Sequence, residues 1–196
     1  MTIAGILRKH GHDVPRYVGP NGRVTFHTNP QTGASGLAIQ PHTFHGGTEH
    51  EPDAGPAEQW WENQEALKRD REAMKKFFPS FVELEASDSE APGWYGELDT
   101  GRGIFPILVR HRTDHTLPSV MPFAPSIRQR HQGKRTLKSP HLYLNGNLCV
   151  ASAEDWDPNR DTIATVIAWA AHWHLCYGDW YVSGIWPTEG LDSVAA

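Results

Sequence analysis

The sequence lacks several features that would place it in a special class of protein. It has only two cysteines, Cys149 and Cys176, too few for a disulfide framework, so we expect a cytoplasmic protein with free thiols. No run approaches the roughly 20 consecutive apolar residues that a membrane helix needs. The net charge of −5 gives no general attraction to nucleic acid or to anionic membranes. With 196 residues, 38% of them hydrophobic, the chain has the composition of an ordinary soluble globular protein.

The N-terminal part of the chain, residues 1–56, is rich in glycine, proline, asparagine and histidine. Within it, residues 17–26 predict a β-hairpin, because a central Asn-Gly pair supplies the positive φ angles of a tight turn. Residues 41–56 have the composition of a linker. We therefore interpret residues 1–56 as an extension, either a specificity element or a flexible arm, and residues 57–196 as the main folded domain.

The first half of the main domain predicts a helix followed by an antiparallel sheet. The helix spans residues 57–78, where Trp60, Leu67 and Met74 recur at every seventh position, and Pro79 ends it. Three strand-like segments then predict a meander, and a proline-rich run after them predicts an edge or crossing segment. In order, these four segments are residues 81–85, 94–98, 104–109 and 117–125.

The second half predicts little regular structure over residues 131–161, and then a helix with Asp161 as its N-cap. The apolar stripe of this helix consists of Ile163, Val166, Ile167, Ala170, Trp173 and Tyr177. Residues 179–187 predict a further short helix, and the tail at 188–196 is expected to fray. The whole pattern predicts an α+β fold with an N-terminal helix, an antiparallel meander, a long loop and C-terminal helices.

Cys149 is the candidate for chemistry, because it follows a turn rather than lying inside a helix or strand. Such a position would leave its thiol near the surface, with His141 nearby and the Asn145-Gly146 turn just before it. A thiol in that setting can act as a nucleophile. The alternative is a packed small hydrophobic residue, since free cysteine is among the residues most often buried. The spacing alone favours neither interpretation.

Residues 57–180 resemble ubiquitin-conjugating enzymes in the order of their elements and in the motifs around Cys149. Asn145-Gly146 stands at the family's offset before the cysteine, Leu148 at its aliphatic position, and Trp156-Asp157-Pro158 follows it. The resemblance implies a ubiquitin-conjugating-enzyme-like fold with an active-site loop, and a thioester carried on Cys149. It also implies that Asn145 belongs to the catalytic site and that Trp156 and Asp157 contact the substrate.

One position departs from the family pattern. Where ubiquitin-conjugating enzymes have His-Pro-Asn, with an asparagine that supports the loop and the oxyanion, this chain has Ser139-Pro140-His141. In place of that asparagine, His141 can donate a hydrogen bond to an oxyanion or act as a base near neutral pH. The alternative is that His141 only braces the loop. The departure leaves open whether lysine is the usual acceptor.

The aromatic C-terminal pattern, residues 168–186, narrows the resemblance. It resembles bacterial conjugating-enzyme-like proteins encoded beside cGAS-like nucleotidyltransferases in CBASS anti-phage systems. This implies a thioester between Cys149 and the C-terminus of the nucleotidyltransferase, formed with an activating enzyme or its equivalent and passed to an amine. One alternative is the conjugating component of a bacterial ubiquitin-like operon, with a ubiquitin-like protein as partner. Another is a non-catalytic binding module with the same fold.

Charged residues outside the loop give weaker signals. Glu154, Asp155 or Asp157 could orient or deprotonate the incoming amine, although solvated loop carboxylates are the more common case. The basic face from Lys68 to Lys76 is either a partner surface, by analogy with the family, or a solvated helix face.

The histidines raise the question of a metal. His172 and Cys176 would share a helix face, with His174 nearby, but further ligands at a recognisable zinc spacing are missing from the sequence. We expect no metal and no other cofactor, and we interpret Cys176 as a core residue.

Overall fold

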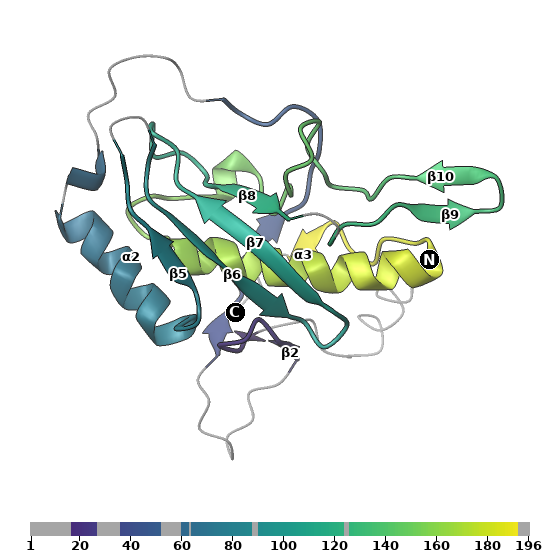
Figure 1. Ribbon diagram of the computed structural model, residues 1–196, viewed down its shortest axis with the longest axis horizontal. Coiled ribbons are helices and arrows are strands. Elements are labelled where there is room, and N and C mark those ends of the chain that lie inside the picture. Colours follow the sequence, from purple (N-terminus) through teal and green to yellow (C-terminus); the bar gives the residue numbers. More distant parts are fainter. Residues whose placement is uncertain are drawn as a thin grey trace.

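A single long helix, α3 (Ile163–Ser183), forms the centre of the fold (Figure 1). The computed structural model describes residues 17–26, 36–51, 60–62, 64–87, 90–123 and 126–191. Most side chains of α3 are buried, with apolar residues all round the helix rather than along one stripe. Such a helix needs packing partners around its circumference, and the other elements provide them.

The ends of α3 differ from the prediction. Thr162, not Asp161, is the N-cap, because the Asp161 carboxylate instead accepts hydrogen bonds from the Asp157 backbone N–H and the Arg160 guanidinium. The helix then continues into the segment predicted as a separate short helix. It ends at Gly184, which adopts the left-handed conformation with φ 78°. The predicted pair of C-terminal helices is therefore one helix.

One face of α3 packs against a four-stranded antiparallel sheet in the order β5-β6-β7-β8 (Figure 1). The strands are β5 (Val82–Leu84), β6 (Gly93–Asp99), β7 (Ile104–Arg110) and β8 (Ser119–Pro122). β6 and β7 pair along their whole lengths, from Gly93 opposite Arg110 to Asp99 opposite Ile104. The predicted meander is confirmed, including the edge position of the proline-rich β8, where a missing N–H group disturbs no further strand.

The basic helix α2 (Gln64–Phe77) follows the short 3-10 helix η1 (Trp60–Glu62) and packs against α3. Leu67 and Met74 are buried, as their spacing predicts. Asp70 is also buried, and its carboxylate accepts a hydrogen bond from the Ile163 backbone N–H at 3.0 Å while its other oxygen pairs with His111. A buried carboxylate thus joins α2 to the first turn of α3.

The N-terminal extension packs on a further side of α3. Its strands are β1 (Tyr17–Val18), β2 (Val24–Thr25) and β3 (Leu37–Ala38), which form an antiparallel sheet in the order β2-β1-β3. β1 and β2 form a hairpin at the Asn-Gly pair, with Gly22 at φ 89°. Val18, Ile39 and Phe44 belong to the same buried cluster as the apolar side chains of α3. Residues on both sides of position 56 therefore share one core.

A second small sheet joins the N-terminal extension to the C-terminal segment. β4 (His42–Thr43) pairs antiparallel with β11 (Gly190–Leu191), and the Phe44 backbone N–H donates to the Glu189 carbonyl at 2.7 Å. The tail that we expected to fray is therefore held over residues 188–191, and the rest of it lies outside the described residues.

Two elements lie within the segment expected to have little regular structure. One is the 3-10 helix η2 (Ala153–Asp155), and the other is a hairpin of β9 (Arg130–Gln132) and β10 (Arg135–Leu137) that projects from the body (Figure 1). The sequence pattern did not predict this hairpin. The whole arrangement mixes helices with antiparallel sheets, in agreement with the α+β class. In the part of the chain that the structure describes, no helix is long and apolar enough to cross a membrane.

Candidate active site

The loop before Cys149, residues 139–149, is closed by its own backbone and is called the cysteine loop below. The Cys149 N–H donates to the His141 carbonyl at 3.0 Å, and the Tyr143 N–H donates to the Asn147 carbonyl at 2.9 Å. Gly146 makes the turn with φ 93°, a conformation that favours glycine. His141 also has a positive φ of 54°, and the Trp173 indole N–H of α3 donates to its carbonyl at 3.0 Å. These bonds place Cys149 at a defined position above α3.

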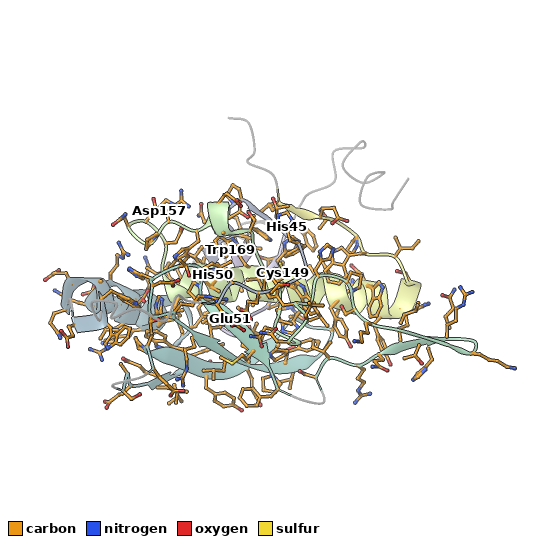
Figure 2. All side chains as sticks on the ribbon, turned by 90° about the horizontal axis from the view of Figure 1, so that it is seen from above. His45, His50, Glu51, Cys149, Asp157 and Trp169 are labelled. Carbon is orange, nitrogen blue, oxygen red and sulfur yellow. The ribbon has the colours of Figure 1, made fainter. Side chains whose placement is uncertain are left out.

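A segment of the N-terminal extension, residues 42–49, crosses the cysteine loop and is called the strap below. The His45 backbone N–H donates to the Cys149 sulfur at 3.2 Å, and Figure 2 shows the two residues beside each other. The Leu144 N–H donates to the Gly47 carbonyl at 2.9 Å. Cys149 is 0% exposed as a result. The expectation of a thiol near the surface is therefore wrong for this state, because the strap covers it. The interpretation of residues 41–56 as a linker is wrong over its described part for the same reason.

Glu49 fixes the end of the strap to the cysteine loop. One carboxylate oxygen accepts a hydrogen bond from the Arg112 guanidinium at 2.6 Å. The other accepts from the side-chain amides of Asn145 at 2.6 Å and Asn147 at 2.7 Å. The side chains of Glu49 and Arg112 are only 6% and 8% exposed. Removing either partner of such a buried ion pair strongly destabilises the folded state, because the other charge stays buried without a counter-charge.

Burial raises the pKa of the Cys149 thiol, and the negative charge of Glu49 adds to the rise. Hydrogen bonds from the Tyr143 side chain and the His45 backbone oppose it, because donors directed at sulfur favour the thiolate. With the strap closed, burial has the larger effect, so Cys149 is held as a protonated thiol. The donors that favour a thiolate are nevertheless already in place.

The His141 ring is part of the contact between the strap and the cysteine loop. Its Nδ1–H donates to the His45 carbonyl at 2.7 Å, and its Nε2 lies 3.4 Å from a Glu189 carboxylate oxygen. The ring packs against Phe44 and Trp186, with centroid distances of 5.7 and 4.9 Å. His141 therefore holds the cysteine loop and the strap together in the closed state.

A comparison with models of protein families assigns the chain to a family. The model of the type II CBASS E2 protein family matches residues 70–193, which include the cysteine loop and α3. The chain belongs to this family. No curated protein and no solved structure matches it. Membership of the type II CBASS E2 family gives the chain an E2-like role in bacterial anti-phage defence.

The segment after Cys149 is held by hydrogen bonds between side chains and nearby backbone groups. Trp156, which the ubiquitin-conjugating enzymes led us to expect at the substrate, is 8% exposed and its indole N–H donates to the His115 carbonyl at 3.0 Å. The Asp157 carboxylate accepts from the Asn159 backbone N–H at 2.9 Å, and Asp157 lies at a distance from Cys149 in Figure 2. Both residues support the turn that leads into α3.

Asp155 and Glu154 differ in what they contact. The Asp155 carboxylate accepts from the Thr43 N–H of the strap at 2.8 Å and from the Ser152 N–H at 2.9 Å. Glu154 is exposed, and a hydrogen bond from Ser152 lowers the pKa of its carboxyl. Asp155 thus anchors the strap at β4, whereas Glu154 is exposed to solvent.

The histidines of α3 are buried. His42 donates through Nδ1 to the Gln40 carbonyl at 2.8 Å, so its Nε2, 2.9 Å from His172 Nδ1, accepts the hydrogen bond between the two rings. His174 stacks on Phe105 at 4.2 Å, and neither of its ring nitrogens has a hydrogen-bond partner. Cys176 is buried as well, and burial raises the pKa of its thiol. Among the described residues, the structure has no group of three or more His, Cys, Asp or Glu side chains that could hold a metal.

Burial also makes the stability depend on pH. It lowers the pKa of His42 to about 4 and that of His174 to about 3. The unfolded chain takes up protons at these side chains near pH 6.5, whereas the folded protein does not until the pH is much lower. The unfolded state therefore binds more protons from pH 6.5 down to about 4, and the free energy of unfolding falls as the pH falls through this window.

Sequence reasoning missed the residues that cover Cys149. Glu49, His45 and Arg112 come from segments far from the cysteine in the chain, so spacing could not associate them. Tyr143 lies within the loop and was not singled out.

Proposed function

We propose that the protein carries the C-terminal acyl group of a cGAS-like nucleotidyltransferase as a thioester on Cys149 and passes it to an amine acceptor. The observation that carries the proposal is the position of Cys149. It stands at the end of a closed loop, with the His45 N–H and the Tyr143 side chain directed at its sulfur. This arrangement, in a chain of the type II CBASS E2 family, supports a nucleophilic thiol over a merely packed one.

Loading and transfer are two exchanges at one carbonyl carbon. In loading, the Cys149 sulfur attacks the donor's C-terminal carbonyl, activated as a thioester on an activating enzyme. A new C–S bond forms, the activating enzyme's cysteine leaves as a thiolate, and it takes up the proton that the Cys149 thiol loses. In transfer, an amine nitrogen attacks the same carbon, the C–N bond forms, the bond to Cys149 breaks, and the nitrogen's proton returns to sulfur.

Loading requires the strap to move, because the closed strap leaves no surface of Cys149 exposed. When Glu49 withdraws, the side-chain amides of Asn145 and Asn147 lose their acceptor and can donate to the oxyanion on the acyl carbonyl. Opening also hydrates the sulfur and removes the nearby negative charge of Glu49. Both changes lower the pKa of the thiol. Burial is the largest influence on that pKa, so its relief outweighs the loss of the His45 N–H donor, which leaves with the strap, and the Tyr143 donor stays in the cysteine loop. The same movement thus exposes the nucleophile and activates it.

A gel assay without reductant tests the proposal. The purified protein is mixed with the nucleotidyltransferase of its own system, an activating enzyme and ATP. We expect an adduct with Cys176→Ala as with the wild type, its loss on adding thiol reductant, and none with Cys149→Ala. An adduct that persists in Cys149→Ala contradicts the proposal. Failure of the wild type to form any reducible adduct favours the non-catalytic binding module. An adduct with a ubiquitin-like protein instead would favour the ubiquitin-like operon.

A further inference from the structure

The chain concentrates positive charge in one segment although it is acidic as a whole. From His115 to Ala153 the sequence contains no aspartate or glutamate, while the net charge of the protein is −5. The cations of this segment are Arg128, Arg130, Lys134, Arg135 and Lys138. All five lie on or next to the β9–β10 hairpin, and residues 128–138 are called the basic hairpin below.

The base of the basic hairpin is fixed to α3. The Tyr177 hydroxyl accepts from the Arg128 backbone N–H at 2.8 Å and donates to the Arg128 carbonyl at 3.2 Å. The Arg130 guanidinium donates to the Tyr181 carbonyl at 3.0 Å and lies against Gly184 at the end of the helix. The hairpin is therefore a rigidly rooted arm, and both views show it standing clear of the body (Figures 1 and 2).

Three charges of the hairpin, two near its tip and one at its base, are not used by the fold. Lys134, Arg135 and Lys138 are exposed, and no carboxylate in the described part of the chain forms an ion pair with any of them. The hairpin also runs directly into the cysteine loop, since Ser139 follows Lys138. A protein attached through its C-terminus to Cys149 would stay beside these cations for as long as the thioester lasts.

We propose that the basic hairpin docks an acidic segment of the protein that is loaded on Cys149. This inference rests on the proposed function and names the chemistry that recognises the donor. One observation favours an acidic protein over nucleic acid. Residues 128–138 contain no phenylalanine, tyrosine or tryptophan on which bases could stack. The hairpin raises the rate at which donor and Cys149 meet, because complementary charges steer association.

Loading kinetics test the docking surface with two matched triple variants. K134E/R135E/K138E reverses the charges, and K134R/R135K/K138R keeps them at the same exposed positions. We expect charge reversal to lower the second-order rate of adduct formation by ~10-fold at low salt, and this difference to shrink as salt is added. The charge-keeping variant should load as the wild type does. Equal rates for both variants at low salt would overturn the proposal.

A direct binding measurement separates this inference from the proposed function. A fluorescent poly-glutamate peptide and a fluorescent DNA duplex are each titrated with the wild type and the reversed variant. We expect the wild type to bind poly-glutamate and the reversed variant to lose that binding, even if no adduct ever forms. Failure of the wild type to bind poly-glutamate, or binding of only the duplex through these side chains, would overturn the docking proposal. Absence of the wild-type adduct alone counts against the thioester chemistry.

Discussion

Replacing Glu49 with glutamine should release the strap without unfolding the protein. The substitution keeps the shape of the side chain and removes the charge that pairs with Arg112. Removing one partner of a buried ion pair costs about 3–5 kcal/mol. Glutamine retains one acceptor oxygen, so we expect the closed state to lose about 3 kcal/mol relative to the open state. Since each 1.4 kcal/mol is a factor of ten, the open population should rise by up to about 100-fold.

The assay is the rate of alkylation by iodoacetamide, measured separately for each cysteine by peptide mass spectrometry. Cys149 should react faster in Glu49→Gln by about the same factor as the open population increases, up to about 100-fold. Cys176 is buried on α3 and is exposed only by global unfolding, so it should stay far slower than Cys149 in both proteins, although the lower stability of Glu49→Gln raises its rate as well. Glu83→Gln is the matched control, because Glu83 pairs with Arg71 at the surface away from the strap. An unchanged Cys149 rate in Glu49→Gln, or equal rates at the two cysteines, would refute a local opening of the strap.

Four further predictions concern polar groups of the core and of the cysteine loop. His174→Leu removes an imidazole without hydrogen-bond partners, so the free energy of unfolding should rise by about 1–3 kcal/mol in chemical denaturation. Burial also lowers the pKa of the half-buried His115 to about 4, so the wild type should lose about 2–3 kcal/mol between pH 6.5 and 5.5 through His42, His115 and His174. His174→Leu should lose about 1 kcal/mol less over the same range, and a wild-type value independent of pH would contradict the assignment. Asp70→Ala should lower the free energy of unfolding by about 3 kcal/mol, because the Ile163 N–H loses its acceptor. Asp70→Asn should lower it by less, because asparagine keeps an acceptor oxygen. His141→Asn tolerates the positive φ but loses the contact with the strap, so it should speed Cys149 alkylation with little change in melting temperature.

Local patterns predicted much of the fold. The heptad spacing of Leu67 and Met74 identified the buried face of α2, and the alternation of residues 81–109 identified the meander. The apolar residues from Ile163 to Tyr177 identified α3. The sequence misplaced its N-terminal end, because the N-cap depends on which groups hydrogen-bond to each side chain. The Asp161 carboxylate accepts hydrogen bonds from Arg160 and from the Asp157 N–H, and Thr162 is the N-cap.

The candidate site could be predicted only in part. The Asn145-Gly146 turn and Cys149 are close in sequence, so their geometry follows from local rules. The covering strap depends on contacts across about half of the chain, such as that between Glu49 and Asn147, and no local pattern encodes these. His45-Gly46-Gly47 looked like a linker because glycine-rich backbone is flexible in isolation. Here its backbone groups are hydrogen-bonded to the cysteine loop.

The chemical linkage at position 149 is the most direct test of a thioester on Cys149. Cys149→Ser should trap the donor as an oxygen ester, which is less reactive toward amines and thiols than a thioester. The trapped adduct with the nucleotidyltransferase is digested, and tandem mass spectrometry identifies the joined peptides. We expect the C-terminal residue of the nucleotidyltransferase to be esterified to the side chain at position 149. Attachment at any other residue, or through an internal residue of the donor, would contradict it.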